Sequence, residues 1–385
     1  MSVLPESFSA LTFIGLWRPV HYKGWKALFY YLYTLVLFAN SLTFIISEAV
    51  EMIFFNNGIF DFFNNSSMLI TIIGMCGKMI TVLHSRNIII EIKKNLNQYP
   101  FKSRDNKENI IKKKFNRVIR FNVLSYASLF EISVVFYTVG KIFEDRPIGV
   151  LPCRAWLPFD YSTPIIYWIA SAQQLITIIM SCNVDIAYDT FVSGVMLQIC
   201  LQVKILKHRY QLMLAKLEEI RTSEIYDEKI STVIEKKLFA DCVEYHIAIL
   251  RMVKIVNLIF SKMIFIQYSF STIILCSSVY AFSQMPAFSP EFIACLVYIL
   301  CMFFQIFVLC MSGQRVTIEF ADLTDTMYNT NWFSLSSHAR KYMMMMMVKS
   351  SRPIEFVSGY LINLSLESFK RLIKLSYTIY SVLQS

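Results

Sequence analysis

The sequence contains little charge and little glycine. Charged residues make up 17% of its 385 residues, whereas hydrophobic residues make up 56%. An average soluble domain carries about 25% charged residues, so this composition excludes an ordinary soluble protein. With only 10 glycines, the chain has little material for the glycine-rich loops that hold the phosphates of nucleotides.

Motifs of the common enzyme classes are also missing. The chain contains no GxSxG or HExxH motif and no phosphate-binding glycine loop. Its five histidines fall in segments expected to be cytoplasmic, and no two of them have metal-ligand spacing. We therefore predict that the protein is not an enzyme and uses no metal and no cofactor.

Disulfides and a cleavable leader are not expected. Of the nine cysteines, only Cys153 falls in a predicted outer segment, and a disulfide needs two thiols on the oxidising side of the membrane. The stretch Met1–Pro19 has no basic segment followed by an apolar run and a small-residue cleavage site. The first membrane span is expected to act as an uncleaved signal.

Long apolar runs recur through the chain. Runs of this length cross a hydrocarbon core of about 30 Å as helices. The sequence predicts an all-α, polytopic membrane protein that forms a single seven-helix membrane domain over 1–385. The predicted spans are approximately 27–46, 66–83, 118–140, 164–203, 255–283, 292–311 and 356–383.

Basic residues are concentrated in alternate gaps between these runs. The gaps 46–65 and 284–291 contain no Lys or Arg, whereas the gaps 85–117 and 204–254 contain ten each. Basic residues near membrane ends stay cytoplasmic. We therefore predict an N-terminus inside and, after seven crossings, a C-terminus outside, which is opposite to a G-protein-coupled receptor. The basic residues are segregated by membrane side, so topology and charged lipid headgroups explain the net charge of +10. We therefore expect no nucleic-acid partner.

Two cytoplasmic segments, approximately 204–254 and 312–355, are predicted to form a helical anchor region. Apolar residues recur at three- and four-residue steps on both sides of the charged turn Arg221–Lys229, a pattern typical of amphipathic helices that need a partner surface. Spans four and five are therefore expected to continue as long helices into the cytoplasm. Ser334–Ser351, with its run of five methionines, is expected to be a further cytoplasmic helix.

Five charged residues inside the second to fifth predicted spans are candidates for a functional role, because unpaired charges there are costly. One hypothesis is a proton or ion relay, as in a transporter; the other, which we favour, is pairing between helices, or snorkelling of the lysines towards the inner face. The fourth and seventh spans are the most polar. Polar groups of the fourth should face protein or water, and the seventh either is not a span or lines an aqueous path. The five residues are Lys78, Glu131, Asp185, Asp189 and Lys262.

The C-terminal third contains an ordered series of short motifs. Gly313-Gln314 follows the sixth span, and Tyr328-Asn329-Thr330-Asn331-Trp332, the methionine run and Ser350-Ser351-Arg352-Pro353 come next. Gly359, Leu364-Ser365-Leu366-Glu367-Ser368-Phe369 and Ser376-Tyr377 complete the series. This order and spacing resemble the insect odorant receptor family. The signature positions are Tyr328, Trp332, Pro353, Gly359, Ser365, Phe369, Ser376 and Tyr377.

The resemblance implies an odorant-gated, non-selective cation channel subunit in the plasma membrane of olfactory sensory neurons. Members of the family are tetramers in which a tuning subunit pairs with the odorant receptor coreceptor, and their last helix lines the pore. The chain lacks the longer cytoplasmic insertion between spans four and five that is expected of the coreceptor itself, so it resembles a tuning subunit. Alternatives are a gustatory-type chemoreceptor channel and, less favoured, a G-protein-coupled receptor or a transporter.

The resemblance also implies a site for small volatile apolar molecules between the outer halves of the helices. Each aromatic or Met residue there could equally be ordinary helix packing. The candidate ligand-binding residues are Met75, Phe136, Tyr137, Tyr167, Ser171 and Tyr298, and the candidate pore residues are Ser376, Tyr380, Leu383 and Gln384. Asn64 and Asn65 begin two overlapping glycosylation sequons on the predicted outer side.

Overall fold

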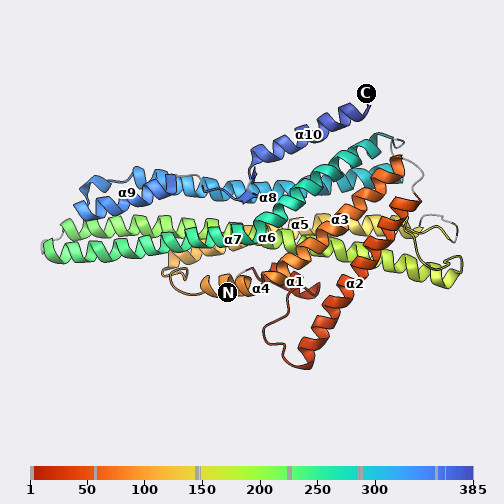
Figure 1. Ribbon diagram of the computed structural model, residues 1–385. Helices are drawn as coiled ribbons and strands as arrows, with labels where there is room; N and C mark the ends of the chain where they lie inside the picture. Colours follow the sequence, from red (N-terminus) through yellow and green to blue (C-terminus); the bar gives the residue numbers. More distant parts are fainter. Residues whose placement is uncertain are drawn as a thin grey trace.

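Long helices dominate the computed structural model of the chain (Figure 1). The structure describes residues 4–55, 59–143, 147, 149–222, 228–284, 286, 289–351, 354–359 and 361–384. The helices are α1 (Pro5–Phe13), α2 (Trp25–Phe54), α3 (Ile59–His84), α4 (Arg86–Asn95), α5 (Asn106–Phe143), α6 (Pro164–Thr222), α7 (Glu228–Gln284), α8 (Pro290–Tyr328), the 3-10 turn η1 (Trp332–Ser334), α9 (Ser337–Ser351) and α10 (Leu366–Gln384). Two short strands, β1 (Val357–Ser358) and β2 (Ile362–Asn363), precede α10.

Five described helices have the length and the apolar composition to cross a membrane, namely α2, α3 from Asn65, α5, α6 and α8. They contain the first, second, third, fourth and sixth predicted spans. The predicted fifth and seventh spans fall in α7 and α10. In α10, Glu367, Lys370, Arg371 and Lys374 lower the hydropathy of a helix that is otherwise long enough.

Helices α6 and α7 are much longer than a membrane crossing of about 20 residues requires, as expected for spans four and five. Helix α6 runs 59 residues to Thr222, and α7 runs 57 residues from Glu228. Figure 1 shows them side by side as a stalk, with α9 alongside. The predicted cytoplasmic helix after residue 334 is α9.

The core is built around α6. Between Val184 and Tyr210 most of its side chains are buried on every face, because the helix packs against α1, α3, α5, α7 and α8. A helix that is apolar on all sides needs such complete coverage. Its position explains why the fourth span tolerates polar residues, since they face protein and not lipid.

The start of the seventh span differs from the prediction. In the predicted span 356–383, the first residues form the antiparallel pair β1–β2, with Val357 opposite Asn363 and Ser358 opposite Ile362. Gly359 has a φ of +57° in the turn, a conformation that an L side chain rarely adopts. Helix α10 starts only after Ser365, whose Oγ accepts a hydrogen bond from the Ser368 backbone N–H at 3.2 Å, as an N-cap does.

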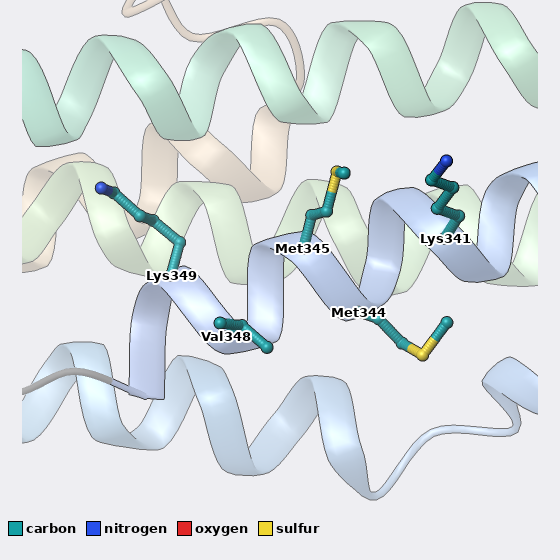
Figure 2. A pocket seen from close by; sticks show the side chains of 5 residues that line it. All are labelled: Lys341, Met344, Met345, Val348 and Lys349. Carbon is teal, nitrogen blue, oxygen red and sulfur yellow. The ribbon is translucent and has the colours of Figure 1, made fainter.

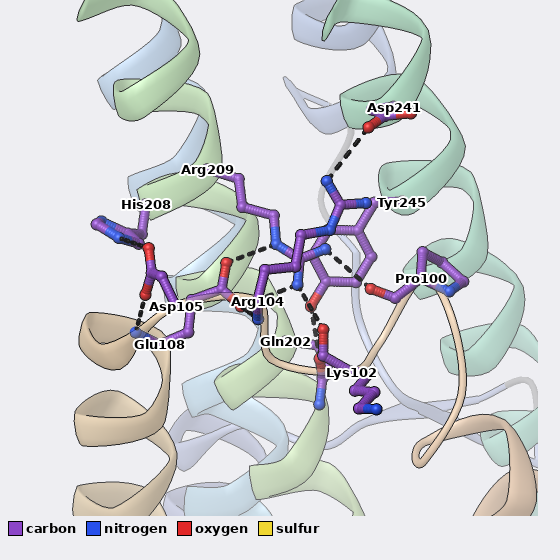
Figure 3. A network of polar contacts seen from close by, with 10 residues as sticks. All are labelled: Pro100, Lys102, Arg104, Asp105, Glu108, Gln202, His208, Arg209, Asp241 and Tyr245. Carbon is purple, nitrogen blue, oxygen red and sulfur yellow. Dashed lines mark hydrogen bonds and ion pairs between the residues drawn. The ribbon is translucent and has the colours of Figure 1, made fainter.

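A polar network fixes the α4–α5 connection to the stalk (Figure 3). The Arg209 guanidinium binds both carboxylate oxygens of Glu108, at 2.7 and 2.9 Å, and donates to the carbonyl oxygens of Pro100 and Lys102. It also lies 4.4 Å from the ring centroid of Tyr245 on α7. Because this buried arginine uses its donors on one loop and one helix, it holds the basic cytoplasmic segment in a defined position.

The two chain ends lie at different levels of the bundle. Figure 1 shows the N-terminus beside α1 and α4, near the start of the stalk. The C-terminus lies at the opposite end, on the side where α2 joins α3 and where α7 joins α8. This arrangement agrees with an N-terminus inside and a C-terminus outside.

Gly313 on α8 allows the segment before α10 to approach closely. A Cβ at this position would lie 2.6 Å from Leu364 Cβ and 2.7 Å from its carbonyl oxygen. Gly313→Ala is expected to destabilise the protein by about 1–3 kcal/mol, because the backbone must move. The check is the thermal midpoint in detergent, with Gly140→Ala in α5 as control, since nothing lies within 4 Å of a Cβ there. Equal midpoints for the two variants would contradict the packing described.

Burial lowers the pKa of His246 in the stalk to about 4, assisted by the Lys349 charge. Its Nε2 lies 3.0 Å from Ser350 Oγ. An unfolded histidine titrates near about 6.5, so between these values the unfolded chain binds a proton that the folded chain does not. Stability should therefore be constant above the unfolded value and fall on acidification, by on the order of 3 kcal/mol at most.

The measurement for His246 is thermal unfolding in detergent across this pH range. His246→Gln should flatten the acid side of the profile, because glutamine is neutral throughout. His338→Gln, at an exposed position on α9, should leave the profile unchanged. An unaltered slope in the first variant would show that His246 does not carry the effect.

Candidate functional site

Two predicted ligand residues lie on α3 and α8, which a hydrogen bond joins at this level. Met75 on α3 is 1% exposed. Tyr298 on α8 is half-buried, and its hydroxyl lies 2.9 Å from Oγ1 of Thr71, which is one turn before Met75 on α3. Two further contacts bring in α5 and α6. Ser133 Oγ on α5 lies 3.1 Å from Cys301 Sγ on α8, and the Cys182 thiol on α6 lies 3.6 Å from the Phe130 carbonyl oxygen on α5. Apolar and weakly polar side chains from four helices therefore meet here.

Three other predicted ligand residues lie beneath the outer segment 150–157. The Tyr167 hydroxyl donates to the Val150 carbonyl oxygen at 3.1 Å, and the Tyr137 hydroxyl lies 3.7 Å from Cys153 Sγ. The buried Ser171 Oγ has no hydrogen-bond partner among the described residues. Phe136, in contrast, is 49% exposed, so it faces outward from its own bundle.

Gln174 links the outer segment to α6 by hydrogen bonds. The sequence did not predict this contact. The Gln174 side-chain oxygen accepts the Cys153 backbone N–H and its NH₂ donates to the Cys153 carbonyl, both at 3.0 Å. Trp156 makes a similar pair of contacts with Ser47 on α2, through its backbone N–H and carbonyl. The outer segment therefore bridges α2 and α6 above the predicted ligand residues.

A buried ionic cluster lies deeper in the bundle. The Lys78 ammonium on α3 is 2.8 Å from Asp185 Oδ1 and 3.0 Å from Asp189 Oδ2 on α6. Its nitrogen also lies 5.5 Å from the ring centroid of Tyr188. Pairing between helices, the interpretation favoured from sequence, is confirmed for these residues. Snorkelling is wrong for Lys78, which is 2% exposed, whereas Lys262 on α7 is exposed.

Three further helices donate to Asp189. The Tyr126 hydroxyl on α5 lies 3.0 Å from Asp189 Oδ2, and the Gln305 NH₂ on α8 lies 2.6 Å from the same oxygen. The Gln267 NH₂ on α7 donates to Asp189 Oδ1 at 3.1 Å. The sequence analysis did not predict these donors. For Gln267 and Gln305, the one indication in the sequence was a glutamine within an apolar span. Five helices thus meet at one carboxylate.

Helix α10 packs against α7 and α8 through one face. Leu372 is 1% exposed and Ser376 3% exposed on that face, and Ser376 Oγ donates to the Leu372 carbonyl at 3.0 Å. Ile373 and Tyr377 are 39% and 68% exposed on the other side. Ser376 therefore faces its own bundle, while the side chains of Tyr380, Leu383 and Gln384 lie outside the described residues.

The signature positions have different structural surroundings. Phe369 packs against Phe307 on α8, with ring centroids 5.5 Å apart, and Trp332 stacks on Phe333 at 3.9 Å. Gly359 forms the hairpin turn and Ser365 caps α10, as described above, whereas Tyr328 and Tyr377 are exposed. Pro353 lies outside the described residues.

A surface groove of about 400 Å³ lies on α9 (Figure 2). Lys341, Met345 and Lys349 form one ridge at four-residue steps, and Met344 and Val348 form the next. The groove is open, so it offers no enclosed site for an apolar ligand. Its apolar side chains are about half exposed, with Met345 at 58% and Val348 at 62%.

The geometry offers little support for a metal site or for N-glycosylation at the predicted asparagines. Over the described residues, no group of three or more His, Cys, Asp or Glu side chains could hold a metal ion. Asn65 is half-buried in α3, and the side chain of Asn64 lies outside the described residues.

Comparison with known proteins places residues 58–377 within the family model described as 7tm Odorant receptor. Odorant receptor Or1 of Anopheles gambiae is 27% identical over 278 residues, which cover 68% of this chain and 66% of that protein. Odorant receptor 46a, isoform A, of Drosophila melanogaster is 24% identical and covers 96% of this chain and 92% of that protein.

The fold is similar to solved structures of the insect olfactory receptor OR5 from Machilis hrabei. The complex of OR5 with eugenol superimposes with a TM-score of 0.85 at 15% identity, covering 99% of this chain and 97% of that one. The structure of OR5 described without eugenol gives 0.83 at 17% identity. At this identity the likeness establishes the fold alone.

Lys78 is expected to be essential for stability. Lys78→Met leaves two buried carboxylates without their cation, and breaking a buried pair on one side costs about 3–5 kcal/mol. We expect a large fall in the thermal midpoint in detergent, whereas Lys262→Met, at an exposed site in α7, should change little. Adding Asp185→Asn and Asp189→Asn to Lys78→Met should recover part of the loss. A Lys78→Met midpoint equal to that of the control would refute the ionic cluster.

Proposed function

The chain belongs to the odorant receptor family whose model its residues 58–377 match, and we propose that it is the odorant-binding tuning subunit of a ligand-gated, non-selective cation channel. As an odorant receptor it is a multi-pass membrane protein of olfaction. Its proposed partner is the odorant receptor coreceptor in a heterotetramer, and its proposed location is the plasma membrane of olfactory sensory neurons.

The site between α3, α5, α6 and α8 supports the ligand-binding part of the proposal. Met75 and Tyr298 supply apolar and aromatic surface, and Thr71 and Ser133 supply a few hydroxyl groups. Sites for small molecules have this composition, largely apolar with few polar groups. Tyr137, Tyr167 and Ser171 extend the proposed site towards the outer segment, and Phe136 ranks last because it faces outward.

The composition of α10 supports the channel part. Its exposed face carries polar and charged side chains beside Ile373 and Tyr377, which is unsuited to lipid. A face of this kind needs water or a neighbouring subunit. Four copies around a common axis would give a pore wall with polar groups and apolar constrictions, to which Tyr380, Leu383 and Gln384 are proposed to contribute.

The stalk and α9 support the assembly part. Met344, Met345 and Val348 are exposed together on α9, and contiguous apolar surface of this kind marks an interaction site. The flanking lysines are charged residues of the type found at the rims of interfaces. We propose that this surface contacts a neighbouring subunit, the coreceptor being the partner expected from the family.

The observation that carries the proposal is the family match, and co-expression tests it. Cells with both this chain and the coreceptor should give odorant-evoked cation currents across a panel of volatile compounds, and cells with this chain alone should be silent. Tyr298→Ala should raise the EC50 about tenfold, since it removes an aromatic wall and a hydrogen bond worth roughly 1.4 kcal/mol together. Tyr342→Ala, on α9, is the control.

Currents that persist without the coreceptor would contradict the proposed assembly. An unchanged EC50 in Tyr298→Ala, with normal surface expression, would contradict the proposed ligand site while leaving the channel intact.

A further inference from the structure

The two carboxylates of the ionic cluster are unequally satisfied. Asp189 receives Lys78, Tyr126, Gln267 and Gln305 through its two oxygens. Asp185 receives only the Lys78 ammonium, on Oδ1, among the residues that the structure describes. A carboxylate accepts up to about four hydrogen bonds. Asp189 is therefore saturated, and Asp185 keeps acceptor capacity on Oδ2.

The charges of the cluster do not balance either. One ammonium faces two carboxylates, so the cluster carries one excess negative charge when both are ionised. Glu131 on α5 directly follows Phe130, whose carbonyl oxygen lies 3.6 Å from the Cys182 thiol one turn before Asp185 on α6. It adds a further carboxylate and no cation. An excess charge in a bundle interior is costly unless a donor or a cation meets it. Asp185 is where that group would bind.

Asp185 lies at the inner end of the proposed ligand site. On α3, Thr71, Met75 and Lys78 follow at four- and three-residue steps, so they share one face. Cys182 and Asp185 are three residues apart on α6 and so share a face, and Lys78 joins that face of α3 to Asp185. The Asp185 side chain retains 11% exposure, compared with none for Asp189. The Asp185 carboxylate therefore keeps a small accessible area that the Asp189 carboxylate lacks.

We propose that Asp185 determines ligand specificity by accepting a hydrogen bond from the polar head of the odorant. The preferred class is a small molecule with an apolar body and a donor head, foremost a protonated amine and next a hydroxyl. The body lies against Met75 and Tyr298, and the head reaches the free carboxylate oxygen. This inference rests on the proposed function, because it concerns the same site.

Three compounds of matched size test the preference in the wild-type heteromer: hexylamine, 1-hexanol and 1-methoxypentane. Amine and alcohol can donate, whereas the ether can only accept. The EC50 of the better donor should be at least about tenfold below that of the ether, the ratio expected for a hydrogen bond to a charged group. An ether as potent as both donors would overturn the proposal. A carboxyl that holds its own proton would give that result, because it would itself donate.

The variant Asp185→Asn distinguishes a role of Asp185 in ligand recognition from a purely structural role. The amide oxygen can still accept from Lys78, but its NH₂ donates where the carboxylate accepted. The ratio of ether to donor EC50 should therefore fall at least about tenfold. A structural role would move all three EC50 values by the same factor and leave the ratio unchanged, which would refute the assignment. Where the variant does not reach the surface, the wild-type ratio decides.

Glu131→Gln is the matched control, since it removes a nearby carboxylate without touching the Lys78 pair. It should keep the wild-type ratio, and loss of the ratio in this variant alone would assign the effect to Glu131 and overturn the proposal. Odorant currents that show no preference for donors reject only the role of Asp185. Absence of any odorant current, with both subunits at the surface, rejects the proposed function and this inference with it.

Discussion

Burial of Asp189 in an apolar bundle is the constraint on which the arrangement of the membrane helices depends. Its carboxylate cannot be hydrated there, so donors must come from protein, and they come from α3, α5, α7 and α8. Apolar surfaces alone would allow helices to slide or rotate against one another at little cost. Four directional contacts with one residue of α6 fix the rotation and the depth of each partner, because misplacing any of them leaves a buried charge less satisfied.

This centre is also connected to the last helix through α7. Gln267 donates to Asp189, and its neighbour Tyr268 donates to the Ser368 carbonyl in the first turn of α10 at 2.6 Å. Slightly nearer the stalk, Ser261 holds the β1–β2 hairpin through Val357 and Gly359. One stretch of α7 therefore contacts both the ionic cluster and the base of α10, so a shift of α7 at one contact must be accommodated at the other.

Topology could be predicted from the sequence because it depends on the number of basic residues in each gap between spans, which is high in one gap and zero in the next. The long stalk helices followed from periodicity for the same reason. Individual contacts did not, because Gln267 and Gln305 resemble any polar residue in a span until the fold brings them to Asp189. The hairpin before α10 was missed because most residues of 356–364 are apolar, and hydropathy does not register the positive φ of Gly359. For the candidate site the sequence predicts only the outer halves of the spans, whereas the rotation of each helix determines that Met75 is buried and Phe136 exposed.

The same physics explains how a ligand could act on such a structure without deforming it extensively. A ligand changes an equilibrium only by its different affinity for two states, and apolar contacts depend little on direction. A polar head at the cluster is different, because hydrogen bonds depend steeply on distance and angle. Since Lys78 is shared between Asp185 and Asp189, any new partner for Asp185 changes the balance of contacts at Asp189, where α7 is held. In the proposed mode of recognition, ligand binding at Asp185 and the position of α7, which contacts α10, therefore depend on the same electrostatic balance.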